Sequence, residues 1–122
     1  MSPAFKTPSS VFGKRLREAR LASGLPQDRL GVLSGLDETT ASARISRYES
    51  GQHAPPYSFA ERLAALLNVP VPYFYAVDDD LANWILAFAR ASANHRSRAL
   101  RILSTAKPEA KVSKHSVTRE RK

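Results

Sequence analysis

The run ISRYESG, residues 45–51, is the most informative stretch of this sequence. Ile45 and Tyr48 follow Ala41 at the three- and four-residue spacing that places side chains on one face of a helix. Gly51 stands where a glycine often ends a helix, because glycine readily adopts the left-handed conformation. The run therefore predicts the carboxyl-terminal half of an amphipathic helix.

One helix is expected on each side of Gly35. Asp37 can accept the unpaired amide protons of a first turn, so we expect it to cap a helix over residues 37–50. Pro26 is tolerated in a first helical turn, and Gly35 can end a helix that starts there. A short helix over residues 26–34 is the consequence.

A longer helix is expected before these two. Ser9 or Ser10 can serve as its N-cap and Gly24 as its end, which predicts a helix over residues 10–23 that follows a flexible arm, residues 1–9. The apolar stripe of this helix consists of Phe12, Leu16 and Ala19, and the charged residues elsewhere on the helical wheel are Lys14, Arg15, Arg17 and Glu18.

The chain is expected to continue as helices after a Pro55-Pro56 break. Ser58 is a plausible cap for a helix that Pro70 ends, and a short turn over residues 71–76 comes next. The aromatic residues of that turn are expected in the core rather than as a platform for stacking bases; they are Tyr73, Phe74 and Tyr75.

Two further helices are expected near the carboxyl end. The triplet Asp78–Asp80 favours the positive end of a helix dipole, Asn94 can cap another helix, and Pro108 marks the end of order. A metal site is the alternative for the triplet, but no other acidic residue or histidine lies near it in sequence, so no metal is predicted. The apolar face after the triplet consists of Leu81, Trp84, Ile85 and Phe88. The fold class predicted is all-α.

Composition excludes several classes of protein. The 122 residues contain no cysteine, which removes disulfides and thiolate catalysis. No apolar run approaches the roughly 18 residues of a membrane span, and the amino terminus lacks the apolar core of a signal peptide, so a cytoplasmic protein is expected. The histidines, His53, His95 and His115, lie far apart, and no glycine-rich phosphate loop is present. We expect neither an enzyme nor a cofactor.

The net charge of +8 points to an anionic partner. Basic groups favour binding to nucleic acid because they release the counterions condensed on phosphates. Half of the excess, +4, falls in residues 107–122, which have no apolar period and are expected to be disordered. Such a tail could bind phosphates, a partner protein or only solvent.

The helix around Arg47 has the features of a reader of DNA bases. Two short helices joined by a turn can place the second in a major groove about 12 Å wide. The planar guanidinium of Arg47 can satisfy guanine O6 and N7 together, and the Ala43 methyl can meet a thymine methyl. With Ile45 turned inward, the residues expected to read bases are Ser42, Ala43, Arg44, Ser46 and Arg47.

In these features the sequence resembles the bacterial and phage Cro/C1-type (XRE) helix-turn-helix regulators. The resemblance covers about residues 11–76. It implies a five-helix lambda repressor-like domain, here with one or two extra helices after it, that binds double-stranded DNA and regulates transcription as a repressor. The matching residues are Leu16, Arg20, Gly24-Leu25, Gln27, Leu30, Gly35, Ile45 to Glu49, Gly51, Pro55 or Pro56, and Leu63 to Val69.

The resemblance also implies roles for individual residues. Gln27 would contact a DNA phosphate, and Arg20 would pair with Glu49 to hold the first helix against the third. As a loop residue after the third helix, His53 is a further candidate for a phosphate contact.

The sequence departs from the family pattern at two places. Gly31 stands where the family has alanine, at a cost of about 1 kcal/mol in helix propensity. Four extra residues also lie between Gly35 and Ile45. They either lengthen the third helix at its start or lengthen the turn, with Thr40 then capping a helix of normal length, and this choice determines whether Thr39 and Thr40 touch DNA. We expect both threonines near phosphates.

The segment after the resemblance has two possible uses. We expect a DNA-binding domain at residues 10–76, followed by helices over 77–106 whose apolar residues exceed what a five-helix domain needs. These helices could form the seam of a homodimer with two-fold symmetry, since proteins of this kind read two half-sites. Alternatively, they or the tail could bind a partner protein, as in an antitoxin.

Overall fold

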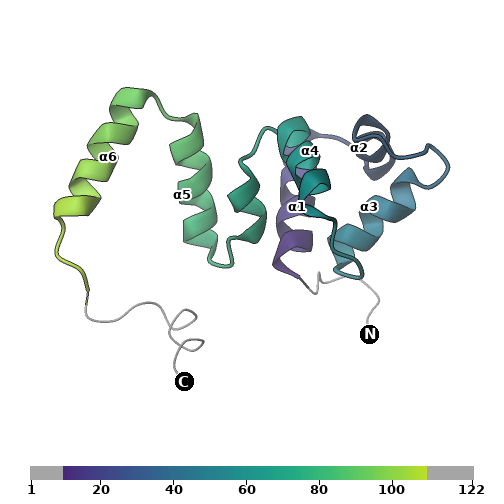
Figure 1. Ribbon diagram of the computed structural model, residues 1–122, viewed down its shortest axis with the longest axis horizontal. Helices are drawn as coiled ribbons and strands as arrows, with labels where there is room; N and C mark the ends of the chain where they lie inside the picture. Colours follow the sequence, from purple (N-terminus) through teal and green to yellow (C-terminus); the bar gives the residue numbers. More distant parts are fainter. Residues whose placement is uncertain (1–9, 110–122) are drawn as a thin grey trace, which may run out of the picture. The chain divides into compact units, whose positions relative to one another are not determined.

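The structure, a computed structural model, describes residues 10–109. Over this range the chain is entirely helical, without a strand, as Figure 1 shows. The elements are α1 (Val11–Ser23), α2 (Gln27–Leu33), α3 (Ala41–Ser50), α4 (Tyr57–Leu67), the 3-10 helix η1 (Val71–Tyr75), α5 (Asp79–Arg90) and α6 (Ala93–Thr105). The predicted all-α fold class is confirmed. The expected arm, residues 1–9, and all but the first residues of the basic tail lie outside the described residues.

Both ends of α1 are explained by the residues that flank it. The hydroxyl of Ser10 accepts a hydrogen bond of 2.9 Å from the amide of Gly13, so Ser10 is the N-cap, one of the two serines proposed for that role. Gly24 ends the helix with φ 74°, in the left-handed region that an L side chain rarely adopts. The chain can therefore turn sharply into α2.

The predicted start of the third helix at Asp37 is wrong. Helix α3 begins at Ala41, and Thr40 occupies the N-cap position without a hydrogen bond from its side chain. The Asp37 carboxylate instead accepts hydrogen bonds from the amide and the hydroxyl of Thr39, which closes a local turn. The four extra residues thus lengthen the turn, which is the second of the two alternatives.

The predicted ends of α4 also need correction. Ser58 lies inside the helix, and Pro56 precedes it with φ −65° and ψ 158°. The amides of Phe59 and Ala60 donate to the Pro56 carbonyl at 2.9 and 3.1 Å, so the proline ring sets the entry without a side-chain cap. Asn68 ends the helix in the left-handed region with φ 57°, two residues before Pro70.

All the elements from α1 through α5 contribute to one hydrophobic core. Phe12 from α1 and Phe74 from η1 pack with their rings tilted by 48° and the ring centroids 4.8 Å apart. Tyr73 is also buried, whereas Tyr75, predicted in the core, is half exposed. The large side chains that are fully buried come from α1, α2, α3, α4 and η1: Leu16, Leu30, Ile45, Leu63 and Phe74.

Helix α5 has an inner and an outer apolar face. Residues up to Arg90 form one compact unit, and those from Ala91 onward form another. Ala82 is buried in the core of the first unit, and Ile85 and Leu86 pack against that core. The apolar stripe expected from the sequence is therefore divided, because three of its members are exposed instead: Leu81, Trp84 and Phe88.

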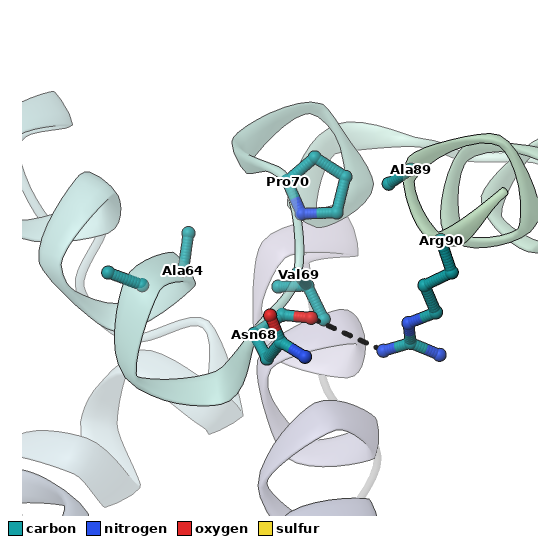
Figure 2. A pocket seen from close by; sticks show the side chains of 7 residues that line it. Ala64, Asn68, Val69, Pro70, Ala89 and Arg90 are labelled. Atoms are coloured by element: carbon teal, nitrogen blue, oxygen red, sulfur yellow. Dashed lines mark hydrogen bonds between the residues drawn. The ribbon is translucent and has the colours of Figure 1, made fainter. Parts of the chain in front are cut away.

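The last turn of α5 lies beside the end of α4. The Arg90 guanidinium donates a hydrogen bond of 3.3 Å to the carbonyl of Asn68 (Figure 2). This contact places a positive charge at the negative end of the α4 dipole. It gives α5 a point of attachment at its carboxyl end.

Helix α6 is capped by Ser92 rather than by Asn94 as predicted. The Ser92 hydroxyl accepts a hydrogen bond of 3.1 Å from the amide of His95, and Asn94 lies inside the helix. No residue of α6 is buried. Its three large apolar side chains are exposed: Leu100, Ile102 and Leu103.

The described residues hold no cluster of three metal-ligating side chains. Within the same range, no helix has both the length and the apolar character to cross a membrane. A small pocket of about 280 Å³ lies between the ends of α4 and α5 (Figure 2). Alanine, valine and proline form most of its lining, and Arg90 and Asn68 supply its polar groups, so it contains neither a nucleophile nor a general base.

Candidate nucleic-acid interface

The second helix of the helix-turn-helix pair, α3, separates its buried residues from its exposed ones. The buried residues are Ala41, Ile45, Tyr48 and Glu49. The exposed residues are Ser42, Ala43, Arg44, Ser46, Arg47 and Ser50. The five positions expected to read bases therefore all lie on the solvent side of one helix, within two turns.

Arg47 and Arg44 differ in how far their guanidinium groups are engaged. No described residue makes a hydrogen bond or ion pair with the side chain of Arg47, which is in the last turn of α3. The Arg44 guanidinium donates a hydrogen bond of 3.2 Å to the hydroxyl of Tyr48, one turn later on the same helix. The Arg44 side chain thus runs along the helix, whereas none of the five donors of Arg47 is used by residues 10–109.

Glu49 is the point at which α1, α2 and α3 meet. Its buried carboxylate accepts hydrogen bonds from Arg20 Nε at 2.5 Å and Nη2 at 3.2 Å. It also accepts one from the side-chain nitrogen Nε2 of Gln27 at 3.1 Å. Arg17 approaches the same carboxylate to 4.0 Å. Arg20 also donates to the Leu25 carbonyl at 3.0 Å, in the turn between α1 and α2. An acidic group beside a DNA-facing helix is therefore neutralised by its own chain.

Gln27 lies at the amino-terminal end of α2, where backbone amide protons are unpaired. Its side-chain nitrogen has two hydrogens, and the bond to Glu49 uses one of them. The sequence did not indicate this contact. The bond to Glu49 orients the side-chain amide of Gln27 and leaves its second N–H group as a donor for another partner.

The remaining phosphate candidates flank α3 at both ends. Thr39 and Thr40 are exposed in the long turn before the helix, and their hydroxyls bond to the carboxylate and the carbonyl of Asp37. His53 is exposed after the helix, and its amide donates to the Arg47 carbonyl at 3.3 Å. The two carboxylates of the turn, on Asp37 and Glu38, are also exposed. Neutral polar groups and carboxylates thus border the same helix.

One basic residue does not lie where its place on the helical wheel suggested. Arg15 was expected off the apolar stripe of α1, but it is only 2% exposed. Its position is three residues after Phe12 and four before Ala19, so it borders that stripe. This neighbourhood is the signal by which its burial could have been predicted.

Comparison with known proteins identifies the kind of domain that carries this surface. Residues 11–72 match the model of a family described as a helix-turn-helix domain. The crystal structure of the transcriptional regulator BswR is similar, with a TM-score of 0.74 and 37% sequence identity, over 77% of this chain and 93% of that one. No curated protein matches the chain.

Proposed function

Because the chain belongs to the helix-turn-helix domain family, we propose that it is a sequence-specific, DNA-binding transcriptional regulator of the Cro/C1-type (XRE) group. It acts as a repressor in the cytoplasm, without enzymatic activity or a cofactor. The observation that carries this proposal is α3, whose exposed face consists of small, polar and cationic side chains on a buried scaffold. Such a face fits a major groove without steric hindrance from large apolar groups.

Arg47 is the main reader of bases in this proposal. Its unengaged guanidinium can donate two parallel hydrogen bonds to guanine O6 and N7. Ser42 and Ser46 supply single, less discriminating hydrogen bonds, and Ala43 offers its methyl to a thymine. Arg44 serves at the flank, where its bond to Tyr48 limits its reach.

Phosphate contacts set the register of the helix on the duplex. Gln27 donates the second hydrogen of its side-chain amide to a phosphate near the start of α2. Thr39 and Thr40 before α3 and His53 after it contact phosphates in this proposal. For this contact, each threonine exchanges the hydroxyl hydrogen bond to Asp37 for one to a phosphate. These contacts orient the protein without reading sequence.

The regulator works as a homodimer that pairs through the segment 77–106. The outer face of α5, defined by Leu81, Trp84 and Phe88, is the proposed seam. Charge supports a second copy as its partner, because α5 is acidic at Asp80 and basic at Arg90. Antiparallel pairing about a two-fold axis places each acidic end against a basic one.

Selection of bound fragments from random DNA tests the proposal. Recovery of an inverted repeat, with half-sites about one helical turn apart, is the expected result. Recovery of no common sequence, with binding that depends on salt alone, would contradict it.

A second candidate function is favoured by α6. This helix has no buried residue and exposes Leu100, Ile102 and Leu103, a larger apolar set than one solvent-exposed helix needs. A partner protein that covers α6 would make the chain an antitoxin-like interaction module. Sedimentation of the purified chain as a stable dimer, with a single half-site bound per protomer, would favour the regulator instead.

A further inference from the structure

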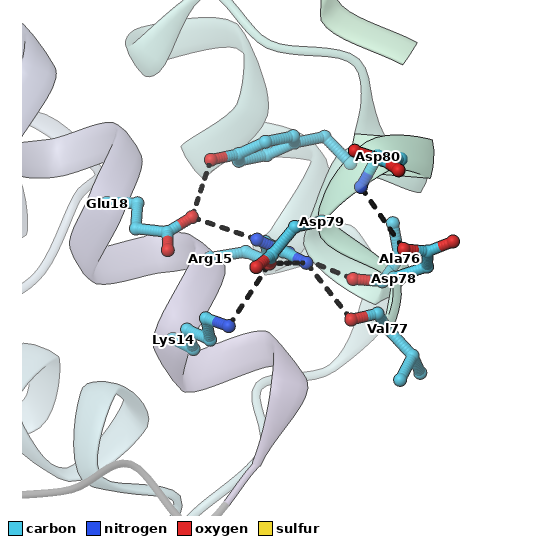
Figure 3. A network of polar contacts seen from close by, with 9 residues as sticks. Lys14, Arg15, Glu18, Ala76, Val77, Asp78, Asp79 and Asp80 are labelled. Carbon is cyan, nitrogen blue, oxygen red and sulfur yellow. Dashed lines mark hydrogen bonds and ion pairs between the residues drawn. The ribbon is translucent and has the colours of Figure 1, made fainter. Parts of the chain in front are cut away.

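A buried arginine of α1 holds the start of α5. Arg15 Nε donates to the Ala76 carbonyl at 2.9 Å, and Nη2 donates to the Val77 carbonyl at 3.2 Å (Figure 3). The same Nη2 lies 2.9 Å from a carboxylate oxygen of Asp79. Residues 76–78 connect η1 to α5, so the guanidinium contacts both this connection and the first turn of α5. We call this set of contacts the Arg15 clasp.

Neighbouring groups hold the Arg15 side chain in place. Arg15 Nη1 donates to Glu18 at 3.1 Å, and the Tyr73 hydroxyl donates to the same carboxylate oxygen at 3.2 Å. The guanidinium carbon lies 5.9 Å from the centre of the Tyr73 ring. Lys14 adds a second cation 3.2 Å from Asp79. Every nitrogen of the guanidinium therefore has an acceptor, as a buried cation requires.

The charges in the clasp support one another. Burial lowers the pKa of Arg15, but the hydrogen bonds and charges of Glu18 and Asp79 outweigh burial and leave that pKa above its ordinary value. The hydrogen bond from Arg15, followed by that from Lys14, lowers the pKa of Asp79 below its ordinary value. Both partners of the ion pair are thus charged at neutral pH.

The clasp fixes both the position and the direction of α5. Contacts to the carbonyls of Ala76 and Val77 fix where the chain leaves η1, and the contact to Asp79 fixes the first turn. Ala82, which is 1% exposed, packs the next turn of α5 into the core. Arg90 attaches the far end of the helix to α4. Because α1 also contacts α3 through the Arg20–Glu49 ion pair, α5 and α3 are both attached to α1 within one compact unit.

We propose that Arg15 is a positioning residue that sets the spacing at which the dimer reads its two half-sites. This inference rests on the proposed function, in which two copies pair through α5. The distance between the two α3 helices then depends on the angle between each α5 and its own α1. The clasp holds that angle, so it selects one spacing although no clasp residue touches a base.

The test uses three DNA probes: the inverted repeat recovered by selection, the same repeat with its spacer changed by 2 bp, and an isolated half-site. The wild-type chain should prefer the recovered spacing by about tenfold or more, since 2 bp rotates one half-site by roughly 70°. Asp79→Asn removes the carboxylate that pairs with Arg15, at a side chain 70% exposed, so this variant should fold. Its preference should fall to about threefold or less, with half-site affinity within about twofold of wild type.

Two variants complete the design. Arg15→Lys keeps the net charge but lacks the fork that grips two carbonyls and a carboxylate at once, so it should also lose the spacing preference. Asp78→Asn is the matched control: it removes the same charge one residue before Asp79, outside the clasp, and the asparagine oxygen still accepts a hydrogen bond from the amide of Asp80. It should keep the wild-type preference.

The outcomes separate this inference from the proposed function. A spacing preference that is unchanged in both Asp79→Asn and Arg15→Lys would overturn the inference alone. Equal loss of affinity on all three probes would also overturn it, because that pattern reflects stability rather than position. Failure to recover any repeat with the wild-type chain would overturn the proposed function and the inference together.

Discussion

Gly31 of α2 faces Ala41 of α3 so closely that a β-carbon at position 31 would lie 2.6 Å from the β-carbon of Ala41. Real β-carbons do not approach one another to that distance, so the two helices pack here only because one residue lacks a side chain. This contact explains why glycine stands at position 31, where the resemblance led us to expect alanine. The loss of helix propensity is the lesser cost.

Gly31→Ala should therefore destabilise the chain. Alanine gains about 1 kcal/mol of helix propensity, but the overpacking should cost about 2 to 3 kcal/mol and leave a net loss of about 1 to 2 kcal/mol. Urea denaturation followed by circular dichroism measures the change. Adding Ala41→Gly should restore part of the loss, whereas a single variant as stable as wild type would contradict the close contact.

Glu49→Gln should lower the free energy of unfolding by about 3 to 5 kcal/mol, because it leaves the buried charge of Arg20 without its partner. The side chains of Arg20 and Glu49 are 9% and 4% exposed. Lys14→Gln breaks the exposed Lys14–Asp79 pair and should cost less than about 1 kcal/mol. Similar losses from the two variants would argue against a special role for the buried pair.

Arg47→Ala should weaken binding to the selected DNA site by about 1 to 3 kcal/mol and relax discrimination at particular base positions. Binding to unrelated DNA should change much less, since the Arg47 side chain is expected to bind base edges. Fluorescence anisotropy on matched and single-substituted sites measures both effects. An equal loss on every sequence would instead assign Arg47 to phosphate binding.

Trp84→Ala should shift the chain from dimer to monomer in sedimentation equilibrium, by about tenfold or more in the dissociation constant. The Trp84 side chain is 50% exposed and lies in the centre of the proposed seam. Leu21→Ala, which truncates a side chain 56% exposed on α1, is the matched control and should leave association unchanged. Dimers that persist in Trp84→Ala would place the interface elsewhere.

Deleting residues 107–122, most of which lie outside the described residues, should weaken binding to every DNA. The segment has a net charge of +4. The slope of log K against log salt should decrease by about 0.9 for each phosphate that the shortened chain no longer neutralises. An unchanged slope would show that the tail binds no phosphate.

The order of the helices could be predicted from the sequence because apolar stripes and stop residues agree. Gly24 and Gly51 end α1 and α3 in the left-handed conformation, as their positions suggested. The start of α3 could not be predicted, because the carboxylate of Asp37 can either cap a helix or close a local turn. The hydroxyl of Thr39 makes the local turn the better one.

The exposed face of the candidate site could be predicted from helical periodicity alone, since Ile45 and Tyr48 define which side is buried. What periodicity does not show is which polar groups meet across helices. The bond from Gln27 to Glu49 joins residues 22 apart, and that from Arg15 to Ala76 joins residues 61 apart. Contacts of this kind depend on how the helices pack, which a single sequence does not encode in any local pattern.

In helix α3, the residues that pack against the rest of the protein are different from those that face solvent. Glu49 and Ile45 hold it to the rest of the protein, while Ser42, Ser46 and Arg47 take no part in that attachment. The outward positions can therefore be exchanged, by evolution or by design, without repacking the interior. A library of variants at these three positions should yield folded proteins with new binding sites, so that one scaffold could serve many promoters.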